Sequence, residues 1–370
     1  MKFTCDRSAL VDKLGVLARG VSTRSALPVL SGILLQAGEG RLELFSTDME
    51  LSIKANLATP VEREGEIVVP ARLFSDVIRN LPDDEVIIDA GEAAIKVSAG
   101  RAAFSLNAWA AADFPQTSTF DMAGAFTVGR DPFVETLNKA GRAASRDETR
   151  PILTGVLMTI MGETLKMVAT DSYRLAVKET KLDHSLENEV QAIVPVKALG
   201  EVTRLAVTLG PGDIEVAIGE NQAVFKLSDP AGDVWIASRL IEGQFPNYKQ
   251  LLPDTFEHQV TIDRGQLMAT ARRVSLLAQK NAPLRLSFAE NRLTMKALTQ
   301  DVGQAEESLD VEFAGEPFEI GFNPAYLIEG VDAVDGDGVL LRFTSPLRPG
   351  LLSGPGDDFT YLIMPIRLSS

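Results

Sequence analysis

The chain repeats one pattern three times, and this repeat constrains its fold more than any other feature. The segments around Thr4, Thr127 and Thr261 each read as a short strand, and an arginine three positions after the threonine opens a helical pattern. In every copy, apolar residues recur 6, 10, 13 and 17 positions after the threonine. That spacing forms one face of an amphipathic helix. The sequence therefore predicts three copies of one structural unit.

Each repeat contains a second step from strand to helix. It begins at Ile67, Ile193 and Ile320, and a proline stands near each helix start, where its missing N–H costs little. The predicted helices span residues 6–20, 71–80, 130–146, 196–205, 264–280 and 324–334. We expect an α+β fold of three similar domains, each with two helices packed on antiparallel sheets. Boundaries near Asp121 and Leu252, in loops rich in Pro, Asp and Thr, give domains of 1–121, 122–252 and 253–370.

Composition is that of an ordinary globular protein. Of the 370 residues, 45% are hydrophobic and 24% are charged, which is typical of domains with their own cores. The apolar runs fall short of the roughly 18 residues that a membrane span needs, so we expect a cytoplasmic location. The single cysteine, Cys5, cannot form an internal disulfide, and its place on an alternating strand indicates a core residue.

Charge is distributed unevenly. The net charge is −15, which alone disfavours nucleic acid, yet the six predicted helices carry 15 basic and 8 acidic residues. The remaining 21 basic and 43 acidic residues give −22 elsewhere. The good helix propensity of Lys and Arg is a competing explanation, but Glu has a similar propensity and is scarce in these helices. The pattern favours one surface that binds a polyanion, although the last helix carries only Glu329 and Asp332.

Helix geometry predicts which cations face away from the core. Positions 12, 15 and 19 after each threonine point away from the apolar face. The cations at these positions are Arg19, Lys139, Arg142, Arg146, Arg273 and Lys280.

No arrangement of residues indicates catalysis, a metal or a cofactor. His184 and His258 are interpreted as solvated loop residues, and no glycine-rich phosphate loop is present. The acidic run 332–338 lacks the final glutamate of a calcium loop and is interpreted as a turn between a helix and a strand. We therefore expect no enzyme, no cofactor and no metal site.

Several segments, spread over all three repeats, resemble the bacterial DNA polymerase III beta subunit family, the beta sliding clamps. They are Leu27-Pro28-Val29-Leu30, Ser46-Thr47-Asp48-Met49-Glu50, Val69-Pro70-Ala71-Arg72, Ala112-Asp113-Phe114-Pro115, Ala169-Thr170-Asp171-Ser172-Tyr173-Arg174-Leu175-Ala176-Val177, Phe245-Pro246-Asn247-Tyr248, Ile320-Gly321-Phe322-Asn323 and Met364-Pro365-Ile366-Arg367-Leu368. The resemblance implies a head-to-tail homodimer that closes into a ring of six domains around duplex DNA. It also implies a processivity factor without enzymatic activity. Its partners would be double-stranded DNA without sequence preference, the replicative polymerase catalytic subunit, the clamp loader and other proteins with clamp-binding motifs.

The family's site residues carry over by position. The pocket for partner peptides would comprise Leu153, Thr170, Ser172, Tyr173, Arg174, Leu175, Pro246, Leu251, Leu362, Met364, Pro365, Ile366, Arg367 and Leu368. For Leu153, Thr170 and Leu362, a place in the core of their strands is equally compatible. The chain departs from the family pattern at Ser172-Tyr173, where Gly-His is usual, at Ile366 in place of a methionine, and in the Ser369-Ser370 extension.

Two further surfaces follow. The resemblance indicates Arg24, Arg146 and Arg150 as DNA contacts, and the charge pattern adds Arg142, Lys197, Arg272 and Arg273. At the dimer interface the family pairs the strand holding Phe104 and Leu106 with the helix region at Leu276 and Leu277, and Arg101 would face Glu306 or Glu307.

Two other functional classes stay open at this point. One is an acidic, repeat-built enzyme, whose best residues would be Asp171, Tyr173 and Arg174. The other is a three-domain scaffold that binds proteins and never touches DNA. Charge on the helices distinguishes the scaffold from the clamp.

Overall fold

The computed structural model describes residues 1–22, 26–115, 120–278, 282–299, 303–354 and 358–368. Arg24 and Lys280 therefore lie outside the described residues. The chain divides into two compact units, Met1–Val134 with Lys197–Leu240, and Glu135–Val196 with Ile241–Ser370. Each unit is described by itself below.

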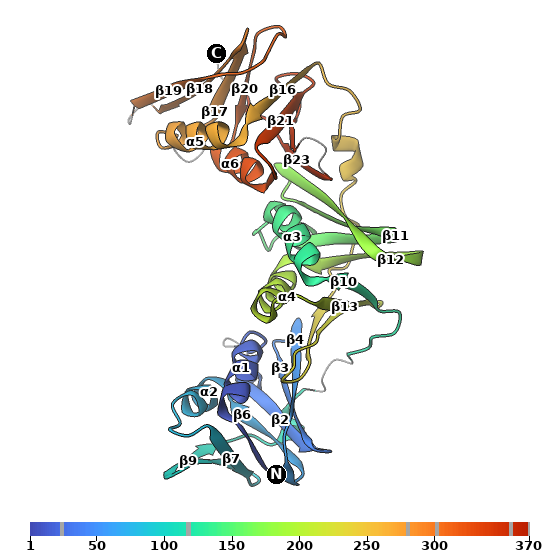
Figure 1. Cartoon of the computed structure of the whole chain (residues 1–370), viewed down its shortest axis with the longest axis vertical. Helices are drawn as coiled ribbons and strands as arrows, with labels where there is room; N and C mark the ends of the chain where they lie inside the picture. Colours follow the sequence, from blue (N-terminus) through green and yellow to red (C-terminus); the bar gives the residue numbers. More distant parts are fainter. Residues whose placement is uncertain (23–25, 116–119, 279–281, 300–302, 355–357, 369–370) are drawn as a thin grey trace. The chain divides into compact units, whose positions relative to one another are not determined.

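The first unit is built on two antiparallel sheets. A five-stranded sheet has the order β5-β1-β7-β8-β9, and an eight-stranded sheet has the order β10-β13-β14-β15-β4-β3-β2-β6. The elements are β1 (Lys2–Asp6), α1 (Arg7–Leu17), β2 (Gly32–Gly38), β3 (Arg41–Thr47), β4 (Leu51–Ala58), β5 (Val61–Arg63), β6 (Gly65–Pro70), α2 (Ala71–Arg79), β7 (Glu85–Ala90), β8 (Ala94–Ala99), β9 (Ala102–Asn107), β10 (Phe126–Gly129), β13 (Asp213–Ile218), β14 (Gln222–Leu227) and β15 (Val234–Arg239). Helices α1 and α2 pack side by side (Figure 1). Most of α4 (Val196–Leu209) also belongs here.

The second unit has the same construction. Its sheets have the orders β11-β12-β23-β22-β21-β16 and β19-β18-β17-β20, and α5 and α6 pack side by side (Figure 1). The elements are β11 (Gly155–Thr170), β12 (Arg174–Pro195), β16 (His258–Asp263), α5 (Arg264–Ser275), β17 (Leu284–Ala289), β18 (Arg292–Thr299), β19 (Gly303–Asp310), β20 (Phe318–Phe322), α6 (Pro324–Ala333), β21 (Gly338–Phe343), β22 (Gly350–Ser353) and β23 (Phe359–Ile363). Helix α3 (Arg130–Ala140) begins in the first unit and ends in the second.

All six predicted helices are present, and their apolar faces are confirmed. Ten of the twelve apolar positions predicted from the repeat are buried, whereas Val21 and Ala278 lie beyond their helices and are half-buried. Carboxylates fix two of the starts, because Asp6 accepts from the backbone N–H of Ala9 (2.8 Å) and Asp263 accepts from that of Gln266 (2.7 Å). The predicted C-terminal ends of the helices agree less well with the structure.

Three predictions about polar residues need correction. Lys139 is buried, not exposed, because its ammonium group pairs with Asp335 and with Glu135 (3.1 Å). His258 begins β16, and its ring stacks on that of Phe318 at 4.6 Å between centroids, so it is not a solvated loop residue. His184 lies within the long strand β12 rather than in a loop. Cys5 is a core residue as predicted, and burial raises the pKa of its thiol to about 12.

The acidic run 332–338 includes the end of α6, a short connection at 334–337 and the first residue of β21, in agreement with the predicted turn between a helix and a strand. Within the described ranges, no group of three or more His, Cys, Asp or Glu residues could hold a metal ion. No helix in the same part of the chain is long and apolar enough to cross a membrane.

Two strand pairings join neighbouring repeats and position the surfaces discussed next. In the first unit, β4 of the first repeat pairs antiparallel with β15 of the second. In the second unit, β12 of the second repeat pairs antiparallel with β23 of the third. We call these pairings the first and second seams.

Candidate partner, DNA and dimer surfaces

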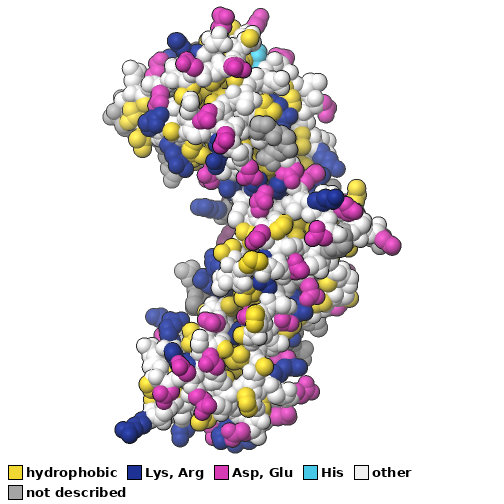
Figure 2. All heavy atoms as spheres, viewed as in Figure 1, with side chains coloured by type: hydrophobic (Ala, Val, Ile, Leu, Met, Phe, Trp, Pro, Cys, Tyr) yellow, Lys and Arg dark blue, Asp and Glu magenta, His cyan; other side chains and the backbone are white. Residues whose placement is uncertain are grey.

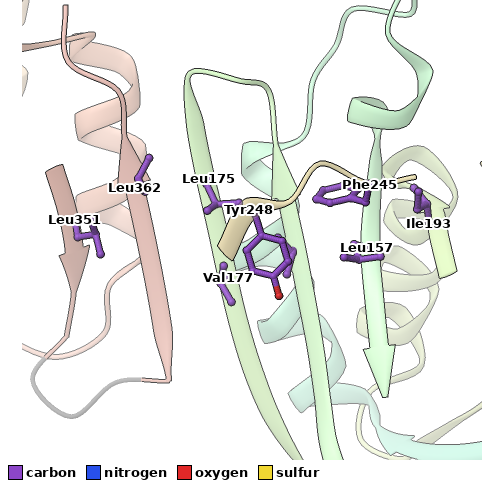
Figure 3. Packing of buried hydrophobic residues seen from close by; sticks show 9 residues of the cluster. Leu157, Leu175, Val177, Ile193, Phe245, Tyr248, Leu351 and Leu362 are labelled. Carbon is purple, nitrogen blue, oxygen red and sulfur yellow. The ribbon is translucent and has the colours of Figure 1, made fainter. Parts of the chain in front are cut away.

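The predicted peptide pocket lies at the second seam, over a hydrophobic cluster. Leu175 of β12 stands directly opposite Leu362 of β23 in the strand register, and Tyr248 lies beside Leu175 and Val177 in the same cluster (Figure 3). Phe245 also belongs to this cluster and lies nearer Ile193 and Leu157. Leu153, Thr170, Arg174, Leu175 and Leu362 are buried, whereas the other predicted pocket residues are partly or fully exposed. The buried aliphatic residues therefore form the floor, and residues such as Pro246, Leu251 and Met364 form the accessible rim. The resemblance did not supply Val177, Phe245 or Tyr248, although Phe245 and Tyr248 stand beside Pro246 in the quoted Phe-Pro-Asn-Tyr segment.

The C-terminal segment is fixed to both sides of this floor. The backbone N–H of Met364 donates to the carbonyl of Tyr173 (2.8 Å), and that of Ile366 donates to the carbonyl of Gly321 in β20 (2.8 Å). A Cβ at Gly321 would lie 2.5 Å from Cδ2 of Leu368 and 3.1 Å from the carbonyl oxygen of Ile366, so a larger residue there would displace the Leu368 side chain. The segment therefore lies in a defined position beside the second seam.

The tight turn between β11 and β12 forms one wall of the site. The Thr170 hydroxyl donates to the carbonyl of Arg174 (2.6 Å), and the Asp171 carboxylate accepts from the N–H groups of Tyr173 (2.9 Å) and Arg174 (3.0 Å). Ser172 occupies the left-handed region with φ of 80°, which disfavours residues with a Cβ. The glycine that the family pattern places here would adopt this conformation without strain.

The Arg174 side chain points away from the hydrophobic floor and into an ion-pair network. Its guanidinium donates to Asp171 (3.0 Å), to Glu329 of α6 and to the hydroxyl of Tyr361 (3.1 Å), and it lies 4.5 Å from the Tyr326 ring centroid. Burial alone would lower the pKa of Arg174, but Tyr361 and Glu329 together raise it above its ordinary value. Asp171 and Arg174 thus neutralise each other. No motif in the sequence indicated that Tyr326, Glu329 or Tyr361 belongs to this network.

The cations predicted to contact DNA fall into two groups. Arg142 donates to the carbonyl of Glu329 (2.9 Å) and pairs with Asp332 (3.2 Å), and Arg273 pairs with Glu307 (2.5 Å). In contrast, Arg146, Lys197 and Arg272 are exposed. Arg150 is also exposed, and it reaches Asp147 (3.0 Å) and the Ser172 hydroxyl (3.3 Å). Acidic and basic side chains are interspersed on the face seen in Figure 2, so the number of cations alone does not define a DNA surface.

A cavity of about 340 Å³ lies beside the loop that holds Arg146 and Arg150, which we call the arginine loop. It is lined by Ala144, Ser145, Arg146, Asp147, Arg150, Asp171, Tyr173, Arg174, Tyr326 and Glu329. The exposed ring of Tyr173 lies at its edge, with 60% of the residue accessible. The turn that holds Ser172 and Tyr173 therefore separates the arginine loop from the hydrophobic floor.

Four of the predicted dimer residues lie on strands that end their sheets, whereas Arg101 precedes β9 and Leu276 and Leu277 follow α5. Strand β9 carries Phe104, which is 41% exposed, and Leu106, which is buried. On the other surface, Leu276 is 81% exposed after α5, Glu306 pairs with Lys296 (3.1 Å) on the neighbouring strand, and Glu307 pairs with Arg273. Two of the three acids of β19, Glu306 and Glu307, therefore have partners within the chain.

Comparison with known proteins agrees with the three repeats. Models of the N-terminal, central and C-terminal domains of the DNA polymerase III beta subunit match residues 1–118, 127–247 and 249–367. The beta sliding clamp of Synechococcus elongatus is 36% identical, and that of Streptomyces coelicolor is 34% identical, each with 100% of both chains covered.

Solved structures give the same result. The DNA polymerase III subunit beta from Pseudomonas aeruginosa superposes with a TM-score of 0.94 at 30% identity, covering 99% of this chain and 100% of that one. A sliding clamp from the same organism, solved bound to griselimycin, superposes with a TM-score of 0.92 at 30% identity over the full length of both chains. The resemblance inferred from the sequence is confirmed, and the chain belongs to the DNA polymerase III beta subunit family, the beta sliding clamps.

Proposed function

We propose that two copies of this chain close head to tail into a ring around duplex DNA and hold partner proteins at the second seam. The observation that carries the proposal is the repeated register of the two seams. In the first seam Leu51 pairs with Ser238, and in the second Arg174 pairs with Ile363. Leu51 and Arg174 each lie three residues after an aspartate of the repeated Thr-Asp motif. Equivalent residues therefore meet at both seams.

The third repeat contains one strand of such a seam and the first repeat contains the other. Neither strand pairs with another repeat within the described sheets. Strand β19 corresponds to β4 and β12, and β9 corresponds to β15 and β23, because each follows the same preceding strand of its repeat. In the described sheets both β9 and β19 are terminal strands. A third seam between β19 and β9 of a second copy would repeat the intramolecular pairing, and two such seams close a ring.

The repeat also predicts the register of this third seam. The N–H of Asn56 donates to Asp233 in the first seam (3.1 Å), and that of Glu179 donates to Asp358 in the second (3.0 Å). Extending the strand registers of each repeat to a second copy supports a pairing of Glu307 with Arg101 of the partner subunit. The same alignment gives Phe104 the position of Ile236 and Tyr361, which are 1% and 0% exposed. A second copy would bury Phe104 likewise.

Exposed cations support DNA contact. Arg150 is exposed beside its partner Asp147, whereas Arg146, Lys197 and Arg272 are exposed and form no ion pair among the described residues. Contacts of this type bind phosphates without reading bases. A ring with such contacts can slide and cannot leave the duplex sideways. Arg142 and Arg273 contribute less to this proposal, because carboxylates within the chain already neutralise them.

The floor at the second seam suits an extended partner peptide. Leu175 and Leu362 offer a buried aliphatic base, and Met364, Pro246 and Leu251 offer accessible apolar rims. We propose that the polymerase catalytic subunit and other proteins with clamp-binding motifs bind here, in the bacterial cytoplasm. Opening the ring requires a separate loader, because the sequence has no nucleotide-binding motif of its own. Domain boundaries near Asp121 and Leu252 fit this organisation.

The mass in solution tests ring closure. We expect multi-angle light scattering to give twice the 39.9 kDa chain mass at micromolar concentration. Phe104→Asp places a charge in the proposed third seam and should shift the population to monomer, whereas Met161→Asp, at another exposed apolar residue, should leave the dimer intact. A monomeric unmodified chain, or a dimer unaffected by Phe104→Asp, would contradict the proposed ring.

A further inference from the structure

A second cavity lies at the first seam, and none of its lining residues belongs to the peptide floor or to β9 and β19. It has a volume of about 320 Å³ and lies between α1 and α4, above the pairing of β4 with β15. Its apolar lining comes from Val11, Val16, Ile53, Leu205 and Ile236. Three arginines also line it, namely Arg19, Arg79 and Arg204. All of these residues belong to the first unit.

The second seam shows why the first seam is hollow. Lys139, at the position of Val16, is buried there, with its ammonium group 5.7 Å from the Phe359 ring centroid. Tyr361 stands opposite Ala176, where the first seam has Ile236 opposite Ile53. Gly15 in the first repeat occupies the position that Asn138 has in the second repeat. The side chains of α1 and β15 that line the cavity are therefore smaller than their counterparts at the second seam, whereas Ile53 of β4 is larger than Ala176.

Gly15 gives an independent indication that this space is retained. It lies in the middle of α1 with an ordinary helical conformation, and a Cβ added to it would meet nothing within 4 Å. Neither backbone geometry nor close packing therefore requires glycine. A glycine inside a helix is unfavourable relative to alanine or leucine, so its presence here has a stability cost that packing does not explain. A larger side chain at this position would extend into the cavity.

The charges of the two seams also differ. In the second seam Arg142 pairs with Asp332. Arg19 occupies the equivalent of Arg142, at 15 positions after the threonine, and Arg204 occupies the equivalent of Asp332, because both follow a buried helix leucine by five residues. Two cations thus line the cavity where the second seam has an ion pair.

The remaining charges leave the cavity cationic. Glu201 pairs with Arg204 (2.7 Å), and Asp12 is the other acid of the lining. Within the described part of the chain, Arg19 and Arg79 form no ion pair. The lining carries three arginines against two carboxylates, so an anionic group is favoured over a cation.

We propose that this cavity binds a small organic anion, with an apolar body on the Val16, Ile53 and Leu205 side and its carboxylate, sulfonate or phosphate group beside Arg19 and Arg204. A volume of about 320 Å³ is at the lower end of the range for ligand pockets, which suits a body of one or two rings. The proposal concerns the free chain and does not depend on ring closure.

Fluorescence titration of the full-length protein with 8-anilinonaphthalene-1-sulfonate tests the site, since this probe combines two aromatic ring systems with one sulfonate. We expect saturable binding in the micromolar range. Gly15→Leu fills the cavity and should weaken binding at least tenfold while slightly raising the melting temperature. Gly200→Leu is the matched control, because Gly200 lies in α4, also has nothing within 4 Å of an added Cβ, and does not line the cavity. Its binding should stay within twofold of the unmodified protein.

The charge component has its own variant. Arg204→Asp recreates the arrangement of the second seam and should weaken sulfonate binding at least fivefold, whereas Arg292→Asp, at an exposed arginine of β18, should not change it. Inorganic phosphate alone, without an apolar body, should compete only at millimolar concentration. Probe affinity that is unchanged in Gly15→Leu would overturn the proposal. Equal weakening by Gly15→Leu and Gly200→Leu would do the same.

Discussion

At the scale of single residues, the structure distinguishes cations that hold the chain together from cations that remain free. Lys139, Arg142 and Arg174 all pair with carboxylates of the third repeat, at Asp335, Asp332 and Glu329. Helical periodicity placed Lys139 and Arg142 on the outer face correctly with respect to their own helix. It could not show that a neighbouring repeat covers that face, because the pairing joins residues more than 180 positions apart.

Ser172 allows a residue-level prediction about backbone strain. Its φ of 80° is unfavourable for residues with a Cβ, at a cost of about 1 kcal/mol. Ser172→Gly should therefore raise the melting temperature by about 2 °C, measured by calorimetry at one fixed protein concentration. Ser172→Ala is the control, because it removes the hydroxyl that contacts Arg150 and retains the Cβ. A rise of equal size in both variants would assign the effect to the hydroxyl rather than to the backbone.

At the scale of elements, the repeat predicted the existence and start of every helix, and it predicted the strand before each one. The predicted ends failed where no local signal stops or extends a helix. Helix α3 ends at Ala140 and continues as one 3-10 turn, Gly141–Ala143, and α4 continues four residues beyond its predicted end to Leu209. The aliphatic floor followed from family resemblance, yet Val177, Tyr248 and Leu351 join it only through tertiary packing across the second seam.

The C-terminal segment gives a prediction at the same scale. A chain ending at Met364 keeps β23 and the bond from Met364 to Tyr173, but it loses the bond from Ile366 to Gly321 and the Leu368 side chain that packs there. The truncated chain retains β9 and β19, the strands of the proposed dimer interface, so it should still form a dimer in solution. Affinity for a peptide copied from a polymerase tail should fall about a hundredfold, since two lost aliphatic contacts are worth about 3 kcal/mol together.

Fluorescence anisotropy with a labelled peptide measures that loss. Arg348→Ala in the full-length chain is the control, because Arg348 is exposed and is not one of the predicted pocket residues. An affinity within threefold of the intact chain would place the partner site outside this segment. Loss of the dimer would show that the segment is structural.

At the scale of the whole molecule, an acidic protein holds a polyanion only if its few free cations gather where the polyanion passes. The net charge is −15, and many of the basic side chains form ion pairs within the chain. Binding to DNA must therefore depend on a small set of exposed cations, and each phosphate contact contributes a defined part of the salt dependence. The salt dependence of DNA binding therefore distinguishes a ring that contacts phosphates from a scaffold that never touches DNA.

Arg272 and Arg273 provide a matched pair for the corresponding experiment. They are neighbours on α5 and both are exposed, but Arg273 pairs with Glu307 through two nitrogens (3.0 and 2.5 Å). In a dimer each substitution removes two positive charges from the ring. Arg272→Gln should lower the slope of log affinity against log salt by about 2 on nicked circular DNA, since each phosphate contact contributes about 0.9. Arg273→Gln should change that slope by less than half as much, because its charge is already neutralised by Glu307.

Retention measured by gel filtration between low and physiological salt gives both slopes. Equal slopes for the two variants would show that ion pairing within the chain does not decide which cations reach the phosphates, and an unchanged slope for both would remove α5 from the DNA surface.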